Sequence, residues 1–219
     1  SYPAADCQWC NDRISSYTEH TNGIPQNSSM QANVIYTSQT DVIEQQVKAA
    51  RQLADFVVVG VHWGVENSHT VVDAQRALAQ SLADWGADLI VGTHPHVLQN
   101  AQWLTAADGR KVFTAYSLGN FISTQEKPDQ LVGAILSVQL EKTTELDGTV
   151  RCSVLSPRLL PTVTHYDAGK SNVRTYLFRD YTEALTKAHG VRQAYPDFSL
   201  EMIQSIAREN IDPEFLQLT

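Results

Sequence analysis

Three histidines stand where the sequence can build a reactive site. His62 directly follows an apolar run at residues 56–61, and His94 and His96 follow a second such run at residues 88–92. Neutral imidazole is a good ligand for Zn, Mn or Fe, and it is the side chain most often used for proton transfer. One histidine at the end of a strand is ordinarily a polar loop residue. Three at the ends of neighbouring strands favour a site that binds a divalent metal ion or catalyses a reaction.

The elements around these histidines predict that they meet. Both apolar runs are nearly continuous and rich in β-branched residues, which is typical of parallel strands buried on both faces. The 32-residue interval from His62 to His94 suits one strand–helix–strand unit, whose right-handed crossover makes its two strands parallel. Neighbouring strands lie about 4.8 Å apart, and α/β sheets usually bind ligands at this carboxyl edge. Spacing alone leaves open whether the rings of His94 and His96 face one ion, since Pro95 stiffens the turn between them.

Two further polar residues belong to the same predicted edge. Glu66 lies four residues after His62, where it can orient an imidazole, bind a substrate amine or carry a proton. Its ordinary interpretation is a solvated loop carboxylate. Asn120 offers both a donor and an acceptor beside a glycine that permits close backbone approach, although a tight turn explains that segment equally well. His69 is a weaker candidate to contact a ligand.

The other histidines and the cysteines give weaker signals. His20, His165 and His189 have no comparable setting, and we predict no role for them in the site. Cys7 and Cys10 have the spacing of a redox pair or of half a zinc site, but the sequence contains no second pair at that spacing. An incidental local disulfide or free thiols therefore explain this pair better.

Length and composition limit the fold and the classes of function. The chain has 219 residues, which suits one domain or one domain with an appendage, and a globule of this size can bury about 70% of its unfolded surface. Apolar residues make up 42% and charged residues 18%, a globular composition. The net charge of -8, with no basic stripe, excludes a typical nucleic-acid binder and argues against adhesion to anionic lipid. No apolar run approaches the roughly 20 residues that span a bilayer.

The first half of the chain predicts alternating strands and helices. Residues 1–32 are polar and read mostly as loop, with a short helix near residues 11–16, and a short strand follows at 33–36. Asp41 is predicted to cap a helix that runs to about Ala54. A second helix is predicted from Asp73 to Trp85.

The second half predicts a different pattern. Two Asp-Gly turns separate apolar runs and indicate antiparallel hairpins. These predicted hairpins pair residues 99–105 with 111–117 and residues 131–140 with 149–155. Helices are predicted at residues 173–189 and 200–209. The predicted fold is therefore α/β, with parallel βαβ units followed by antiparallel hairpins and C-terminal helices.

Three segments together resemble the signature blocks of one protein family. They are residues 61–66 (VHWGVE), 86–97 (GADLIVGTHPHV) and 116–121 (YSLGNF). Thr21-Asn22-Gly23, with Tyr17 nearby, resembles an upstream block of the same family, Tyr-Gly-Thr-Asn-Gly. The chain thus resembles the CapA/PgsA family of bacterial poly-γ-glutamate capsule biosynthesis proteins over about residues 14–165.

The resemblance implies a fold and a set of site residues. The family is similar to calcineurin-like metallophosphoesterases, which have an α/β/β/α sandwich with a dinuclear metal centre at the sheet edge. Residues 1–165 would form the C-terminal portion of that domain, with residues 166–219 as a helical extension packed on it. His62, His94 and His96 would be metal ligands for a divalent ion such as Zn, Mn or Fe. Glu66 and Asn120 fall in family blocks as candidate catalytic residues.

One part of the superfamily pattern has no counterpart in this sequence. The superfamily carries an Asp-rich first motif and an Asn-His motif in an amino-terminal half, and nothing in residues 1–55 matches them. Three imidazoles suffice for one zinc-like ion, but not for the usual two-metal clamp on a phosphoester. We therefore expect the missing N-terminal half of the domain to be a partner of this chain, as a separate or a removed segment.

The resemblance implies a function in the cell envelope. The expected protein is extracytoplasmic and acts as a metal-dependent hydrolase on an anionic polymer or a phosphoester in capsule biosynthesis or processing. Membrane components of a capsule synthase are its expected partners, and nucleic acid is not. The alternative is a non-catalytic accessory module of a capsule-polymer synthesis or export complex, and a third possibility is a plain α/β scaffold without metal.

Overall fold

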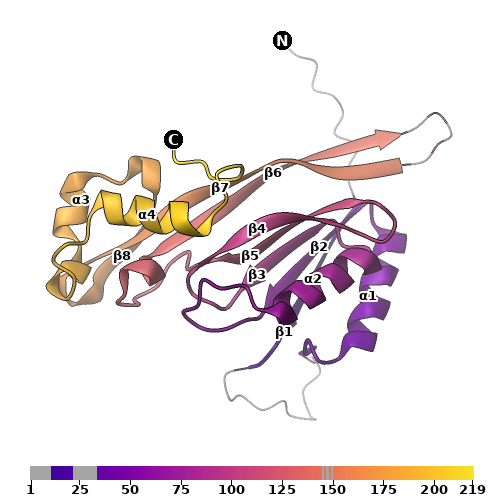
Figure 1. Cartoon of the computed structure of the whole chain (residues 1–219), viewed down its shortest axis with the longest axis horizontal. Coiled ribbons are helices and arrows are strands. Elements are labelled where there is room, and N and C mark those ends of the chain that lie inside the picture. The colour runs from indigo at the N-terminus through magenta and orange to yellow at the C-terminus, as the bar shows by residue number, and fades with distance from the viewer. Residues whose placement is uncertain (1–10, 22–33, 145, 147, 149) are drawn as a thin grey trace.

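In the described part of the chain, the main sheet has five strands (Figure 1). The computed structural model describes residues 11–21, 34–144, 146, 148 and 150–219. The strand order is β1-β2-β3-β5-β4, with all neighbours parallel except the β4–β5 hairpin. The bounds are β1 Asp12–Thr18, β2 Phe56–His62, β3 Leu89–Thr93, β4 Leu98–Thr105 and β5 Lys111–Leu118.

Two helices cover one face of this sheet. They are α1 (Thr40–Leu53) and α2 (Asp73–Trp85). Because successive side chains of a strand point to opposite faces, alternate residues of β2 pack against these helices. Val57, Val59 and Val61 share one buried core with residues of α1 and α2. This packing holds the end of β2 in place, and with it His62.

A second sheet and the C-terminal segment pack on the opposite face. The three-stranded antiparallel sheet is β6 (Val132–Thr144), β7 (Val150–Asp167) and β8 (Ser171–Leu177). The helices that follow are α3 (Glu183–Ala188) and α4 (Leu200–Asn210). Phe56, Leu89 and Phe113 of the main sheet share a second buried core with residues of β7 and α4. The four short 3-10 helices span Pro128–Leu131, Ala168–Lys170, Phe178–Asp180 and Gly190–Gln193.

The architecture confirms the α/β class and most predicted elements. The parallel βαβ units come first, and both predicted hairpins are antiparallel strand pairs. The helix over residues 73–85 is where it was expected. Asp41 lies in the first turn of α1, but Gln39 holds the N-cap position, so the predicted cap residue was wrong. A carboxylate in the first turn still interacts favourably with the helix dipole.

Two segments differ from the sequence-based prediction. The short helix expected near residues 11–16 is strand β1, which pairs in parallel with β2 along its whole length. Residues 33–36 were expected to form a strand. The structure describes residues 34–36 of this segment, where Tyr36 forms only an isolated bridge to Thr18. In β1, pairing with a distant strand overrides the local preference of a polar segment.

The helix expected over residues 173–189 was also largely wrong. Residues 171–177 form strand β8 against β7, and the helix α3 covers only six residues. Val173, Thr175 and Tyr176 are β-branched or aromatic, which suits a strand. The proposed boundary at residues 165/166 falls inside β7 and stays a prediction. Cys7, Cys10, Asn22 and Gly23 lie outside the described residues.

In the described part of the chain, no helix is both long enough and apolar enough to cross a bilayer.

Candidate metal centre

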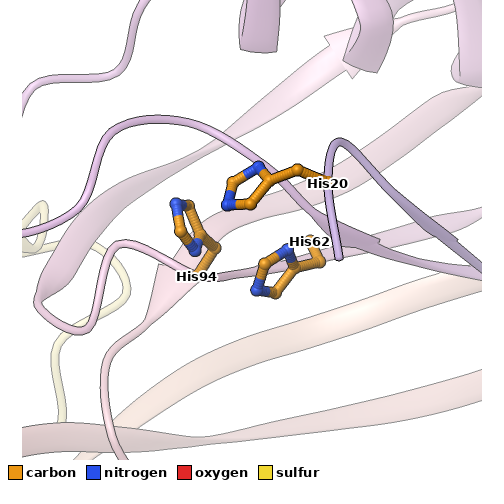
Figure 2. A group of neighbouring side chains, drawn as sticks. All are labelled: His20, His62 and His94. Carbon is orange, nitrogen blue, oxygen red and sulfur yellow. The ribbon is translucent and has the colours of Figure 1, made fainter. Parts of the chain in front are cut away.

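The carboxyl ends of three adjacent parallel strands carry the candidate site (Figure 2). β2 ends at His62, and His94 directly follows the last residue of β3. β1 ends at Thr18, two residues before His20. Thr18 is the register partner of His62, and His62 is the partner of Thr93. Strand register alone therefore brings three histidines from distant parts of the sequence to one place.

His20, His62 and His94 form the first group of possible ligands. One ring nitrogen from each lies within 4.8 Å of those of the other two. The ring centroid of His94 is 4.4 Å from that of His20 and 4.4 Å from that of His62, and the other two centroids are 5.3 Å apart. Figure 2 shows the three rings gathered around one small space. This all-imidazole group suits a zinc-type ion.

Glu66, His94 and His96 form the second group. One ligand atom from each lies within 4.8 Å of the others, and the ring centroids of His94 and His96 are 6.0 Å apart. Glu66 is exposed, His96 is half-buried and His94 is buried. His94 therefore belongs to both groups and stands at the centre of the site.

The structure brings most of the predicted site residues to this edge. Each of these residues belongs to at least one of the two groups: His62, His94, His96 and Glu66. His62 and His96 do not share a group. Their roles as ligands or catalytic groups stay predictions. His69 belongs to neither group. Its Nδ1 lies 2.7 Å from the carbonyl of Leu98.

His20 is the residue that sequence reasoning missed. It follows β1, whose segment Asp12–Thr18 is mostly polar and exposed and gives no apolar strand signal. The prediction of a loop and a short helix there left His20 without a place on the sheet. The signal that points to it is the upstream family block around Thr21, which lies directly after His20.

Hydrogen bonds fix the tautomer of His62. The hydroxyl of Thr18 has one proton, which it donates to the carbonyl of His20 at 2.7 Å. The same oxygen lies 3.1 Å from Nδ1 of His62, so it must accept a proton from that nitrogen. Because neutral imidazole carries one N–H, Nε2 of His62 has a free lone pair. This is the arrangement of a metal-ligating histidine held by a hydrogen bond from its other nitrogen.

Asn120 fixes the tautomer of His96 in the same way. Its amide nitrogen donates to the carbonyls of His96 at 3.2 Å and Gln130 at 3.0 Å, which sets the orientation of the amide. Its oxygen lies 2.9 Å from Nδ1 of His96, so that nitrogen is the donor. Nε2 of His96 is therefore left with a free lone pair. The predicted residue Asn120 thus acts on the site through His96.

His94 is buried without the partner that its chemistry requires. Its Nδ1 forms no hydrogen bond with any residue that the structure describes. Burial, together with His20, lowers the pKa of His94. Burial, followed by the neighbouring His94 and His20, lowers the pKa of His62. Both rings are thereby kept neutral, which is the form that binds metal.

The loop between β3 and β4 holds His94 and His96 in an unusual backbone conformation. Their φ angles are 102° and 62°, in the left-handed region that residues other than glycine rarely adopt. The amide of Asn67 donates to the carbonyl of Pro95 at 2.7 Å, and this bond secures the loop from outside. Backbone strain of this kind is typical of functional sites.

Trp63, which directly follows His62, forms a buried aromatic pair with Tyr116. The indole N–H of Trp63 donates to the carbonyl of Tyr116 at 2.9 Å, and the two rings are stacked with centroids 5.8 Å apart. A Cβ at Gly92 would lie 1.9 Å from that carbonyl oxygen and 2.3 Å from the indole nitrogen. Only glycine therefore permits this bond directly before the Thr-His-Pro-His segment.

The donor set fits a divalent ion. The site offers imidazole nitrogens with free lone pairs on His62 and His96, a buried unpartnered nitrogen on His94, and the exposed carboxylate of Glu66. Imidazole donors favour Zn, Cu, Ni or Fe, and a carboxylate adds Mn to that range.

Comparison with known proteins gives consistent matches. Residues 5–125 match the family model described as "Bacterial capsule synthesis protein PGA_cap". The chain is 40% identical over 108 residues to "PGA biosynthesis protein CapA" of Bacillus subtilis (strain 168), which covers 49% of this chain and 26% of that protein. It is 42% identical over 89 residues to "Capsule biosynthesis protein CapA" of Bacillus anthracis, which covers 39% of this chain and 20% of that protein. The matched part thus spans about a quarter or less of these relatives.

Proposed function

Because the chain belongs to the bacterial capsule synthesis protein family PGA_cap, we propose that it is a metal-dependent hydrolase module that acts on an anionic polymer or phosphoester in capsule biosynthesis or processing. The observation that carries the proposal is the convergence of His62, His94 and His96 with Glu66 at one sheet edge. The names of the two Bacillus relatives concern PGA and capsule biosynthesis, which supports poly-γ-glutamate as the polymer.

The histidines would hold the ion, and the residues around them would serve the reaction. When bound, a divalent ion lowers the pKa of a water molecule and polarises the oxygen of the scissile bond. Nε2 of His62 and Nε2 of His96 carry the free lone pairs for binding. The carboxylate of Glu66 is exposed beside His94 and His96, where it can accept a proton at an oxygen and release it to solvent.

Asn120 is assigned a positioning role. Its amide nitrogen already donates to the carbonyls of His96 and Gln130 and to the side-chain oxygen of Gln125, at 2.7 Å. Its oxygen accepts from His96. Because these contacts use the donor and acceptor capacity of the amide, Asn120 orients His96 and leaves the substrate to other groups.

A pocket next to Asn120 suits an anionic substrate. It has a volume of about 470 Å³ and is lined in part by Lys127, Lys170, Gln125 and Gln130. Both glutamines also contact Asn120, so the pocket adjoins the site. Lys170 forms an ion pair with Glu126 at 2.6 Å. Glu126 also lines the pocket and offsets the charge of Lys170, so the ammonium group of Lys127 supports binding of a carboxylate-rich chain such as poly-γ-glutamate.

The proposal extends to the surroundings of the protein. We place the chain outside the cytoplasm at the cell envelope, together with membrane components of a capsule synthase. A further part of a longer family protein would complete the domain. These points are supported by family membership and by the fact that the chain matches about a quarter or less of each Bacillus relative.

The test is hydrolysis by the purified chain supplied with Zn²⁺ or Mn²⁺. The substrates are poly-γ-glutamate of defined length and an aryl phosphate ester, and the readouts are chain length and phenolate release. We expect turnover that falls by about 100-fold or more in His94→Ala, because it removes the imidazole shared by both groups, and in His96→Ala, because it removes the imidazole beside His94 and Glu66. His69→Gln is the matched control, a histidine substitution outside both groups, and it should keep the activity. Circular dichroism verifies that each variant is folded.

A non-catalytic accessory function is the second candidate. Two observations favour it. Both relatives are named for biosynthesis. In addition, Glu66, the carboxylate in the ligand groups of the described residues, is exposed. In that case the metal-supplied chain shows no turnover but still binds poly-γ-glutamate. Lys127→Ala should then weaken binding several-fold, whereas Lys48→Ala, on α1 across the main sheet, should not.

A further inference from the structure

We propose that His20 is a ligand of the metal ion, so that His20, His62 and His94 form a complete three-imidazole site within this chain. The inference rests on the proposed function only in taking a divalent ion as the natural occupant of this edge. The resemblance to the capsule family implied His62, His94 and His96 as ligands and gave His20 no role. The assignment of His20 comes from the geometry of β1.

The first step is the position of the ring. One nitrogen of His20 lies within 4.8 Å of the ligand nitrogens of both His62 and His94, and its ring centroid is 4.4 Å from that of His94. Neither ring nitrogen of His20 forms a hydrogen bond with any residue that the structure describes. The ring therefore lies against the rings of His62 and His94, and its nitrogens make no hydrogen bond to the described residues.

The second step is the anchoring of the turn that carries His20. The amide of Glu19 donates to the carbonyl of His62 at 2.8 Å, and the Glu19 carboxylate accepts from the amide of Gly64 at 2.9 Å. The hydroxyl of Thr18 donates to the carbonyl of His20. His62 and Gly64 thus bind the turn after β1, so contacts within the protein set the position of His20 without an ion. Such preorganisation is what a ligand site requires.

The third step is the set of available lone pairs. Thr18 accepts from Nδ1 of His62, which leaves Nε2 of that ring for the ion. Nδ1 of His94 is buried and has no partner among the described residues. An unpaired buried polar atom costs about 1–3 kcal/mol. A cation bound between the three rings would satisfy the donor atoms together and remove this cost.

The chemistry of the group selects the ion. Three imidazoles without a carboxylate favour Zn²⁺, Cu²⁺ or Ni²⁺ over Mg²⁺ or Ca²⁺. A zinc ion with three protein ligands keeps a fourth position for water or substrate. The group with Glu66 and His96 shares His94 but includes an exposed carboxylate. We therefore infer that the all-imidazole group would hold the ion, with His94 shared with the neighbouring group of Glu66 and His96.

The experiment measures metal binding without reference to activity. The purified chain is titrated with Co²⁺, followed by its visible absorption, and Zn²⁺ affinity is measured by competition. We expect a tetrahedral Co²⁺ spectrum in the wild type and a loss of Zn²⁺ affinity of about 100-fold or more in His20→Ala. His69→Ala, a histidine near the same edge but outside both groups, should change the affinity less than about threefold.

A second variant tests direct coordination. Zinc sites accept cysteine in place of histidine, so His20→Cys should retain binding and add a thiolate-to-cobalt charge-transfer band in the near ultraviolet. Only a side chain in contact with the ion produces that band. It also separates coordination from a structural effect, because a variant that merely disturbs the turn would lose affinity without gaining the band.

Each result decides the inference separately from the proposed function. Metal binding that depends on His20, in a chain without hydrolytic turnover, supports the inference and contradicts the hydrolase proposal. Turnover with wild-type metal affinity in His20→Ala overturns the inference and leaves the hydrolase proposal intact. A wild-type chain that binds neither Co²⁺ nor Zn²⁺, or a His20→Cys variant that binds Co²⁺ without a charge-transfer band, also overturns the inference.

Discussion

At the scale of single residues, His94 combines three unfavourable properties. Its side chain is buried, with 7% of its surface exposed, its φ is 102°, and its Nδ1 lacks a partner among the described residues. Left-handed backbone costs an ordinary residue about 1–2 kcal/mol. A residue keeps such a conformation only where its surroundings determine it. Those surroundings include Gly92, two residues before His94. Gly92 packs against the carbonyl of Tyr116 and the indole of Trp63.

We predict that Gly92→Ala destabilises the protein by about 3 kcal/mol or more. The new Cβ would lie 1.9 Å from the carbonyl oxygen of Tyr116, at the point where that oxygen accepts from Trp63. Neither backbone nor indole can move away without breaking the bond, and overpacking of a core commonly costs about 1–3 kcal/mol even without a backbone clash. Urea unfolding followed by Trp fluorescence measures the effect.

Gly109→Ala is the matched control for this prediction. Gly109 has a φ of +86°, and a Cβ there would meet nothing within 4 Å. Its substitution costs only the conformational term, about 1 kcal/mol. Equal losses for both variants would show that the close approach of Gly92 to Tyr116 is unimportant.

At the scale of elements, a buried carboxylate ties the opposite end of the sheet together. Asp88 is 3% exposed and accepts from the backbone amide of Val57 at 2.8 Å. It also pairs with Arg51 at the end of α1, at 2.5 Å, and with Arg110 of the β4–β5 turn, at 3.1 Å. One side chain thus joins a helix, two parallel strands and a hairpin. Its contacts set the strand register on which the histidine cluster depends.

We predict that Asp88→Ala lowers the free energy of unfolding by about 3 kcal/mol, because it removes the buried carboxylate that accepts from the Val57 amide and pairs with both Arg51 and Arg110. Asp108→Ala is the control, since Asp108 pairs with the same Arg110 but lies in an exposed position. An exposed pair contributes less than about 1 kcal/mol. Chemical denaturation of both variants gives the comparison, and a loss at position 88 no larger than that at 108 contradicts the prediction.

The elements also explain what could be predicted from the sequence. β2 and β3 are nearly continuous apolar runs that are buried on both faces, so His62, His94 and His96 could be placed at one edge from sequence alone. β1 is polar and becomes a strand only by pairing with β2, whose register partners are 44 residues away. β8 likewise depends on β7. His20 and the second sheet's last strand were missed because tertiary pairing, which no local pattern encodes, determines them.

At the scale of the whole molecule, buried histidines link the second sheet to the C-terminal segment. His189 is 2% exposed, lies 3.0 Å from the carbonyl of Thr164 through Nε2, and accepts from the amide of Val191 through Nδ1. Burial, opposed by the hydrogen bond to Thr164 and by Asp167 and assisted by His165, lowers the pKa of His189 to about 4. An unfolded histidine has a pKa of about 6.5. Between these values the unfolded chain binds more protons than the folded one.

The stability of the whole protein should therefore fall in acid. The contribution of His189 is complete above about pH 6.5 and is lost as the pH falls through the folded pKa of about 4. Relative to His189→Gln, the wild type should lose about 2–3 kcal/mol of its advantage in unfolding free energy between about pH 7.5 and pH 4.5. Urea unfolding at both pH values measures it, and an unchanged difference between the two proteins would refute it.

The position of β1 in the sheet has a consequence for synthesis of the protein. β1 leaves the ribosome before β2 and β3, yet it pairs in parallel with β2, and His62 of β2 pairs in turn with Thr93 of β3. Parallel pairings between distant segments raise contact order and slow folding. The nascent chain must therefore emerge beyond residue 94 before His20, His62 and His94 can meet. Assembly of the three imidazoles requires pairing of β1, β2 and β3, so a metal-dependent signal from this cluster reports chains in which these three strands have paired.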